Sequence, residues 1–274
     1  MIRRIVIAAA LFAPAGGVAA QSNEAPKTSI GISLGYQAST SLWDVANQLI
    51  APVTLPPKVG TSWDPDAWHL RRDAAGTFAL QVRGTRYLGE QVGVVAEFSL
   101  SAVKPTDRCS IVQRGRGGEV PNADPGLPAV CDSIPVTSQG SSTAMSLQGG
   151  MILRPFPGSV LQPYFEGLAG IASMGSSTAA LKSDIGGATV TIYRDPEWHR
   201  IRPTFVVGAG IATELARGLH GRFAVRDTWM SQSVITGSPD ILSTDVTTST
   251  KFKGYISVMV GLDIVLTKQW GRRY

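Results

Sequence analysis

The chain has 274 residues, of which only 16% are charged, and 25 Lys and Arg residues against 20 Asp and Glu residues give a formal net charge of +5. The basic residues are scattered, without the Lys/Arg run that is typical of a nucleic-acid surface. Beyond residue 20 no apolar stretch approaches the roughly 18 residues of a spanning helix, so the sequence excludes a helical membrane protein.

The first 20 residues have the composition of a Sec-type signal peptide. Arg3 and Arg4 form a short basic start, residues 5–12 are apolar, and residues 18–20 are small. This pattern predicts export and cleavage after Ala20. The alternative is an N-terminal membrane anchor, for which the apolar stretch is short.

After a polar leader at residues 21–27, the rest of the chain, residues 28–274, reads as one β-rich domain. Residues 29–37 alternate, with four apolar side chains on one face and small or polar ones on the other. The apolar set is Ile30, Ile32, Leu34 and Tyr36. This alternation predicts the first strand.

A long segment, residues 38–76, follows the first strand. Residues 41–50 have apolar side chains at helical spacing, Ser41 can cap the start, and Pro52 follows the end. We therefore expect a short amphipathic helix here, packed on the rim of the fold.

Period-2 alternation predicts seven further strands. They cover residues 77–87, 91–101, 143–153, 164–172, 204–215, 219–230 and 254–266. The strand at 164–172 has two candidate phases. We expect Phe165 and Ile171 to point outward, because the other phase places the Glu166 carboxylate on the outer wall, where a charge is costly in lipid.

The last strand has the strongest signal of membrane insertion. Its outward set is entirely aliphatic: Ile256, Val258, Val260, Leu262, Ile264 and Leu266. About ten residues of a tilted strand are enough to cross the hydrocarbon core of a bilayer.

Long and short connections alternate along the chain, and the long ones cover residues 38–76, 102–141, 173–200 and 231–252. Outer-membrane barrels have short periplasmic turns and long outer loops. The sequence therefore predicts an all-β, eight-stranded antiparallel up-and-down transmembrane β-barrel. Both termini are expected in the periplasm of a bacterial outer membrane.

Charged residues fall on the inward faces of the predicted strands, where they must be paired. They are Arg83, Glu97, Glu166, Glu214, Arg222, Arg226 and Asp263. Equal distances from the turn predict that Arg83 faces Glu97, and Arg222 is expected to bridge Glu214 and Asp263. This network is either a polar plug or a narrow ion path.

Cys109 and Cys131 are the two cysteines, and they lie in one polar segment. In an exported chain this spacing predicts a disulfide. Metal binding is the weaker alternative, because no histidine lies in that segment. His69, His199 and His220 lie on separate elements, so we expect no metal site, no cofactor and no catalytic triad.

Aromatic residues gather near the ends of the predicted strands, as in the interfacial girdles of membrane barrels. They are Tyr36, Tyr87, Tyr164, Trp229, Tyr255 and Trp270. The glycines of Gly208-Ala209-Gly210 are expected to leave room for bulky Arg and Tyr side chains inside the barrel.

Three stretches carry a family resemblance: residues 163–170 (PYFEGLAG), 208–210 (GAG) and 222–227 (RFAVRD). With them, the chain resembles the small eight-stranded outer-membrane barrels of the OmpA/OmpX-like type, the outer membrane protein beta-barrel domain family. It departs from the usual ending on an in-phase aromatic residue, because the tail 268–274 continues past the last strand.

The resemblance implies a structural or surface-interaction role through the loops, without catalysis. The partners expected are outer-membrane lipid, the barrel-assembly machinery during insertion and an extracellular ligand at the loops, with the chain a monomer and no nucleic acid bound. The alternatives are a small porin-like passive pore, a lipid-modifying enzyme of the outer membrane and a secreted soluble barrel.

Overall fold

The fold is taken from a computed structural model. The structure describes residues 28–50, 66–113, 131–134, 142–174, 180–185, 188–194, 201–237 and 247–266. The expected signal peptide, the leader and the tail after residue 266 lie outside these ranges.

Eight of the strands close into one antiparallel barrel, in the order β1-β13-β12-β11-β8-β7-β5-β4. The staves are β1 (Thr28–Gln37), β4 (Thr77–Tyr87), β5 (Val92–Val103), β7 (Ser142–Leu153), β8 (Leu161–Met174), β11 (Ile201–Ala216), β12 (Leu219–Gly237) and β13 (Thr247–Val265). The predicted eight-stranded antiparallel barrel is confirmed, and β13 closes it by pairing with both β1 and β12. No helix in the described ranges is both long and apolar enough to cross a membrane.

Side-chain direction alternates along every barrel strand, because successive residues of a pleated strand point to opposite faces. The outer wall is aliphatic: on β13, Val260 is 62% exposed and Ile264 is 58% exposed. On β8, Phe165 and Ile171 point outward while Glu166 is buried, so the predicted phase of this strand is confirmed.

The two ends of the barrel differ. One end, called here the turn end, carries the short connections after β4, β7 and β11. The predicted register at the first of them is confirmed, since Arg83 on β4 lies opposite Glu97 on β5. Gly218, in the tight turn between β11 and β12, has a φ of 79°, a conformation that glycine adopts without strain.

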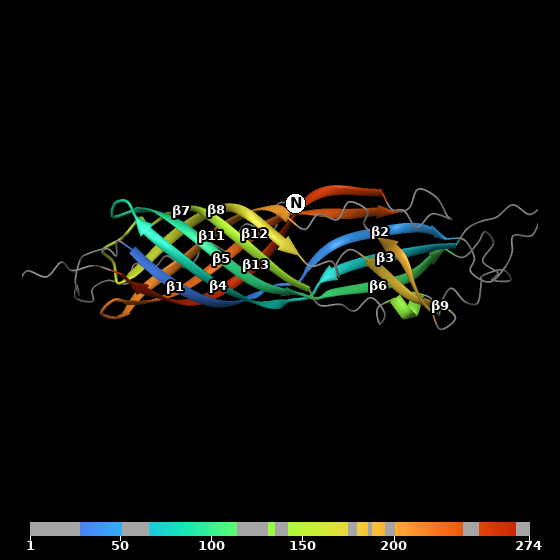
Figure 1. The fold of residues 1–274 in the computed structure, drawn as a ribbon, viewed down its shortest axis with the longest axis horizontal. Coiled ribbons are helices and arrows are strands. Elements are labelled where there is room, and N and C mark those ends of the chain that lie inside the picture. Colours follow the sequence, from blue (N-terminus) through green and yellow to red (C-terminus); the bar gives the residue numbers. More distant parts are fainter. Residues whose placement is uncertain are drawn as a thin grey trace, which may run out of the picture.

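The opposite end, called the loop end, carries further β-structure (Figure 1). A three-stranded sheet has the order β2-β3-β6, and β9 (Ala180–Ile185) pairs with β10 (Ala188–Arg194). The sheet consists of β2 (Thr40–Ile50), β3 (Asp66–Ala74) and β6 (Pro105–Gln113). We call this sheet, together with one helical turn at residues 131–134, the cap.

The predicted helix at residues 41–50 is wrong, because these residues form β2. The register between β2 and β3 shifts between Ser41 and Trp43 and again between Val45 and Gln48. Such bulges put adjacent residues on one side of a strand, and Leu42 and Trp43 are both buried. The two shifts produce a spacing of apolar residues that imitates a helix.

A hydrophobic core joins the cap to the loop end of the barrel. From the cap it includes Leu42, Trp43, Val45, Trp68, Leu70, Ala74, Cys131 and Ile134, and from the barrel strands Val103, Ala144, Ala172, Met174, Met230, Val234, Ile235 and Tyr255. Ile134 and Leu70 are fully buried. The predicted disulfide is confirmed: Cys109 and Cys131 are bonded, with 5.4 Å between their Cα atoms.

Candidate functional site

The centre of the lumen is a bridge between opposite walls. The Arg226 Nη1 atom on β12 lies 2.8 Å from Glu97 Oε1 on β5, and the Arg226 Nε atom lies 2.9 Å from Glu166 Oε1 on β8. Each of these side chains is at least 98% removed from solvent. One guanidinium therefore serves two carboxylates that have left water, the arrangement that buried charge requires.

A second arginine enters the same cluster from β4. The Arg83 Nη1 atom lies 2.9 Å from Glu166 Oε2. Glu97 is the cross-strand neighbour of Arg83 in the register. The ion-pair partner of Arg83, however, is Glu166, and the ion-pair partner of Glu97 is Arg226. The pattern of one strand pair cannot reveal such partners, because they come from the far side of the closed barrel.

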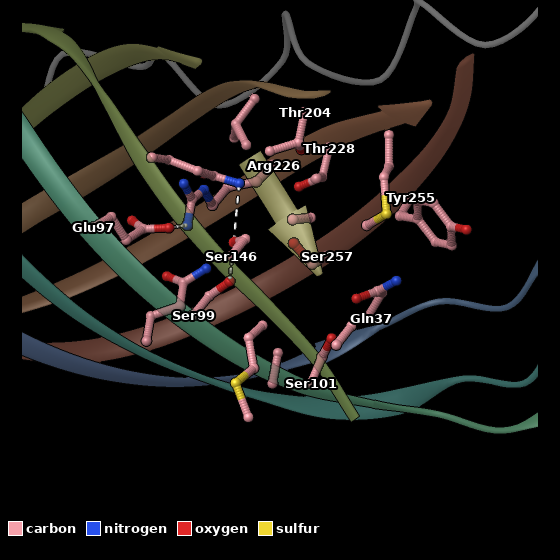
Figure 2. A pocket seen from close by; sticks show the side chains of 18 of the residues that line it. Gln37, Glu97, Ser99, Ser101, Ser146, Thr204, Arg226, Thr228, Tyr255 and Ser257 are labelled. Atoms are coloured by element: carbon pink, nitrogen blue, oxygen red, sulfur yellow. Dashed lines mark hydrogen bonds and ion pairs between the residues drawn. The ribbon is translucent and has the colours of Figure 1, made fainter. Parts of the chain in front are cut away.

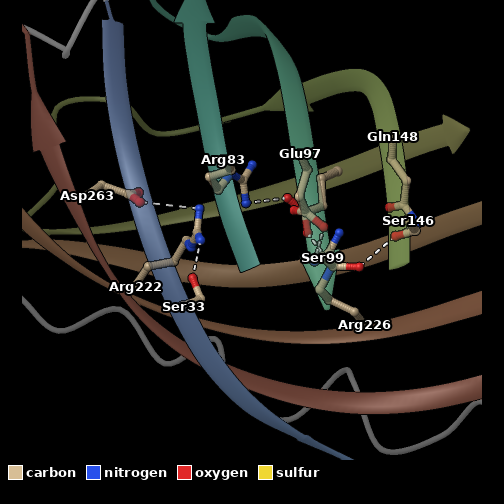
Figure 3. Close-up of polar contacts among 10 residues, drawn as sticks. Ser33, Arg83, Glu97, Ser99, Ser146, Gln148, Arg222, Arg226 and Asp263 are labelled. Atoms are coloured by element: carbon tan, nitrogen blue, oxygen red, sulfur yellow. Dashed lines mark hydrogen bonds and ion pairs between the residues drawn. The ribbon is translucent and has the colours of Figure 1, made fainter. Parts of the chain in front are cut away.

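A third arginine lies nearer the turn end. The Arg222 Nη1 atom lies 3.4 Å from Asp263 Oδ1, and its Nη2 donates a hydrogen bond to the Ser33 hydroxyl. Figure 3 shows Arg222 between Asp263 and Ser33. The Asp263 side chain is 15% exposed, so this pair is less completely buried than the central one.

The prediction that Glu214 belongs to this network is wrong. Glu214 is exposed, and it lies opposite His220 just before a register shift at the end of the β11–β12 hairpin. Arg222 lies opposite Ala212 instead. Glu214 is still in phase with His220, but it lies at the very end of the hairpin, beside the turn, where its carboxylate stays in solvent.

Glycines make room for the network, as the sequence predicted. A Cβ atom on Gly208 would lie 3.0 Å from Glu166 Oε1 and 3.1 Å from Arg226 Cγ. A Cβ atom on Gly210 would lie 2.6 Å from the hydroxyl of Tyr164. Any larger residue on this face of β11 would displace the charged cluster or the Tyr164 ring.

A cation–π contact that the sequence did not predict lies at the turn end. The Arg154 guanidinium lies 3.4 Å from the centre of the Tyr87 ring, and it donates hydrogen bonds to Gln162 Oε1 and to the Glu90 carbonyl. Burial lowers the pKa of Arg154 below its ordinary value, and a neighbouring aromatic face favours the cation. Arg154 directly follows Leu153, the last residue of β7, which points outward. Continued alternation would therefore have predicted that Arg154 faces inward.

Above the charged cluster, toward the loop end, the lumen contains a cavity of about 50 Å³ (Figure 2). Glu97, Arg226 and Thr204 contribute to its polar lining. Ser146 hydrogen-bonds to Ser99 across 2.6 Å and accepts from Gln148 at 3.2 Å. On the side nearer the loop end, the cavity is lined by Met230 and Tyr255, which belong to the hydrophobic core shared with the cap.

The cap has its own buried ion pair, which the sequence analysis also missed. The Arg72 Nε and Nη2 atoms lie 2.5 and 2.8 Å from the two carboxylate oxygens of Asp107. Both side chains are 1% exposed, and the guanidinium lies 5.5 Å from the centre of the Trp43 ring. Alternation along β3 and β6 would have placed both residues on one face, had those strands been recognised.

The two histidines in the described ranges, His69 and His220, lie on different sheets. His69 lies on β3, where its Nε2 is 2.8 Å from Asp44, and His220 lies on β12 opposite Asp263. His199 falls outside the described residues. Within the described ranges no group of three or more His, Cys, Asp or Glu side chains could hold a metal ion.

The aromatic residues divide between the two faces. Tyr36 and Trp229 are on the outer wall, 50% and 37% exposed, whereas Tyr164 and Tyr255 are buried inside the molecule. Tyr36 also packs edge-on against Phe78 of β4. The girdle prediction is therefore wrong for Tyr164 and Tyr255, and also for Tyr87, which packs inward against Arg154. A position near a strand end does not determine which face a residue occupies. Trp270 lies outside the described residues.

No protein-family model matches the chain, and no curated protein matches it. Among solved structures it is similar to Neisserial surface protein A, with 9% identity and a TM-score of 0.44 over 88% of this chain and 97% of that one. For the outer membrane protein OprG of Pseudomonas aeruginosa the identity is 12% and the TM-score 0.46, over 90% and 98% of the two chains. For the outer membrane protease OmpT of Escherichia coli the corresponding values are 10%, 0.39, 90% and 99%. At TM-scores below 0.5 these likenesses carry no further argument, and the barrel fold rests on the strand pairing of the chain itself.

Proposed function

We propose that the chain is an outer-membrane barrel whose lumen is a structural plug and whose cap is the functional surface, presented outside the cell. The observation that carries this proposal is the Arg226–Glu97 bridge across the lumen. A wall-to-wall ion pair without solvent exposure occupies the path that a solute would take.

The exposed aliphatic wall supports insertion in a bilayer. In water such a surface would be an aggregation hazard. The outward residues from Ile256 to Leu266 span ten residue steps, which at a strand tilt of about 45° amounts to about 25 Å, the height of an outer-membrane apolar band. These aliphatic side chains are therefore stable when they face lipid and unstable when they face water.

The cap supports a surface-interaction role. It has a buried ion pair and a disulfide of its own and shares a hydrophobic core with the barrel, so its outward face is held in one shape. Rigid presentation lowers the entropy lost on binding. With both termini in the periplasm, the cap faces the extracellular medium, where it contacts a partner, and the chain acts there as a monomer without catalysis.

A small passive pore is the second candidate, and the cavity above the charged cluster is the observation that favours it. A planar-bilayer recording of the refolded chain separates the two. The plug predicts no steady conductance at moderate voltage, whereas regular openings that disappear on replacing cavity-lining residues with bulky ones would establish the pore.

Membrane insertion is tested independently by gel migration. We expect the detergent-extracted protein to migrate differently before and after boiling, because a closed barrel keeps its compact shape in detergent until heated. An unchanged band, together with solubility in detergent-free buffer, would contradict the proposal and favour a secreted soluble barrel.

A further inference from the structure

The cavity above the charged cluster is lined by neutral polar side chains. Five of them keep some exposed surface although they point into the lumen: Gln37, Ser99, Ser101, Ser146 and Thr228 (Figure 2). The charged cluster lies on one side of the cavity, and the core shared with the cap lies on the other. The exposed surface of these five side chains is therefore inside the barrel, where a molecule of the size of water can touch it.

Part of this lining makes no hydrogen bond within the protein. Ser99 and Ser146 hydrogen-bond to one another. The Ser101 and Thr228 hydroxyls and the Gln37 amide, by contrast, have no side-chain hydrogen bond among the described residues. A hydroxyl or an amide that leaves bulk water without a partner costs free energy. Buried water supplies such partners, because one water molecule makes about three hydrogen bonds.

The charged residues beside the cavity do not call for an ion. Glu97 and Arg226 belong to the lining and are paired with each other, and Glu166 pairs with both Arg83 and Arg226. Two guanidinium groups therefore face two carboxylates, and the cluster carries no net charge. The other lining side chains are neutral, so an ion bound here would lack a counter-charge. The ligand that suits this cavity is uncharged and both donates and accepts hydrogen bonds.

The volume of the cavity sets the size of this ligand. The cavity measures about 50 Å³, and each water molecule needs about 10–15 Å³ of space open to its centre. We propose that the cavity binds a cluster of about three to five water molecules, held by Gln37, Ser101, Thr228 and the bonded pair of serines.

The rest of the lumen stays dry. The next inward row beyond Arg226 toward the turn end consists of Ala224 and Met259, which lie opposite one another, are each 2% exposed and belong to an apolar core. Water therefore fills the lumen from the cap down to the Arg226–Glu97 bridge and ends there. This inference goes beyond the plug and the cap of the proposed function, and it does not depend on membrane insertion.

The test is the nuclear Overhauser effect between water and methyl groups in the refolded protein, in deuterated detergent micelles. Methyl groups have no exchangeable hydrogen, so a cross-peak reports water beside them. We expect cross-peaks to the methyl groups of Ala144 and Ala172, which line the cavity. The methyl group of Ala224, in the same lumen beyond the charged cluster, should show none.

Two variants test the hydroxyls, with circular dichroism as the check that each one folds. Ser101→Ala combined with Thr228→Val should weaken the cross-peaks by about half, because it removes two of the five partly exposed polar side chains. Thr85→Val is the matched control, since Thr85 is a buried residue of β4 outside the cavity lining, and it should leave the cross-peaks unchanged.

The unaltered chain alone can overturn the proposal. Xenon dissolved in the sample would shift the Ala144 and Ala172 methyl signals if the cavity were dry, since an empty apolar cavity binds xenon. Such shifts without any water cross-peak would contradict the proposed cluster. Cross-peaks of equal strength at Ala224 would also contradict it, because they would place water throughout the lumen.

Discussion

Arg226 and Glu97 are 2.8 Å apart although they lie on opposite walls of the barrel. In the strand order, three strands separate β12 from β5 in either direction. Their ion pair therefore spans the lumen and ties two halves of the chain, 129 residues apart in sequence, to one another. A contact of this kind forms only when the barrel is closed, so it reports on closure.

Replacing Arg226 with Met should be among the most destabilising changes in the lumen. It leaves the buried carboxylates of Glu97 and Glu166 without this cation, and breaking a buried pair on one side costs about 3–5 kcal/mol. The free energy of unfolding, from urea titration of tryptophan fluorescence in lipid vesicles, measures the loss. A loss below about 1 kcal/mol would mean that water reaches these carboxylates.

Replacing Arg222 with Met should cost less than replacing Arg226. Arg222 serves one carboxylate, that of Asp263, which is partly exposed, and the Ser33 hydroxyl. Losing one charged hydrogen bond of this type costs about 1.5–3 kcal/mol. The same urea titration ranks the two variants, and an Arg222 variant that proves the less stable of the two would contradict the assigned partners.

Replacing Glu214 with Gln should change the free energy of unfolding by less than about 0.5 kcal/mol, because exposed charges contribute little. This variant is the matched control for the lumen carboxylates. Glu166→Gln, which keeps the size of the side chain but removes the charge beside Arg83 and Arg226, should be clearly destabilising in the same assay.

The barrel itself could be predicted from the sequence because each stave obeys one local rule. A strand with lipid on one face must be aliphatic at every second position, and the run from Ile256 to Leu266 follows that rule without interruption. The register of the short β4–β5 hairpin was equally accessible, because turn length and alternation fix which residues, here Arg83 and Glu97, face one another.

The cap could not be predicted in the same way. Its strands lie in the long connections, and bulges in β2 replace period-2 alternation with a helix-like spacing at Leu42 and Val45. The partners of the lumen arginines were hidden for another reason. Which of Glu97 and Glu166 meets Arg83 depends on barrel diameter and stagger, which are properties of the closed sheet and of no single strand pair.

Removing the disulfide should loosen the cap and leave the barrel intact. Cys109 and Cys131 are 22 residues apart, and opening a loop of this length costs about 3 kcal/mol in the chain-entropy model. In a Cys109→Ser, Cys131→Ser variant, we expect faster proteolysis of the cap and an unchanged heat-dependent gel shift. Loss of the gel shift would show that the barrel needs the cap in order to stay closed.

Breaking the Arg72–Asp107 pair should also act on the cap alone. Asp107→Asn removes the negative charge that faces the Arg72 guanidinium, which is 1% exposed to solvent. We expect the cap to lose about 3–5 kcal/mol of local stability, because the buried cation is then left without a counter-charge. Hydrogen exchange of β3 and β6 amides measures this loss, with the barrel amides as an internal reference.

Replacing the pair together, as Arg72→Met with Asp107→Leu, should restore most of the protection, because apolar side chains of similar size carry no unpaired charge. If the double variant exchanges as fast as Asp107→Asn, the hydrogen bonds of Arg72, and not its charge, hold the cap together.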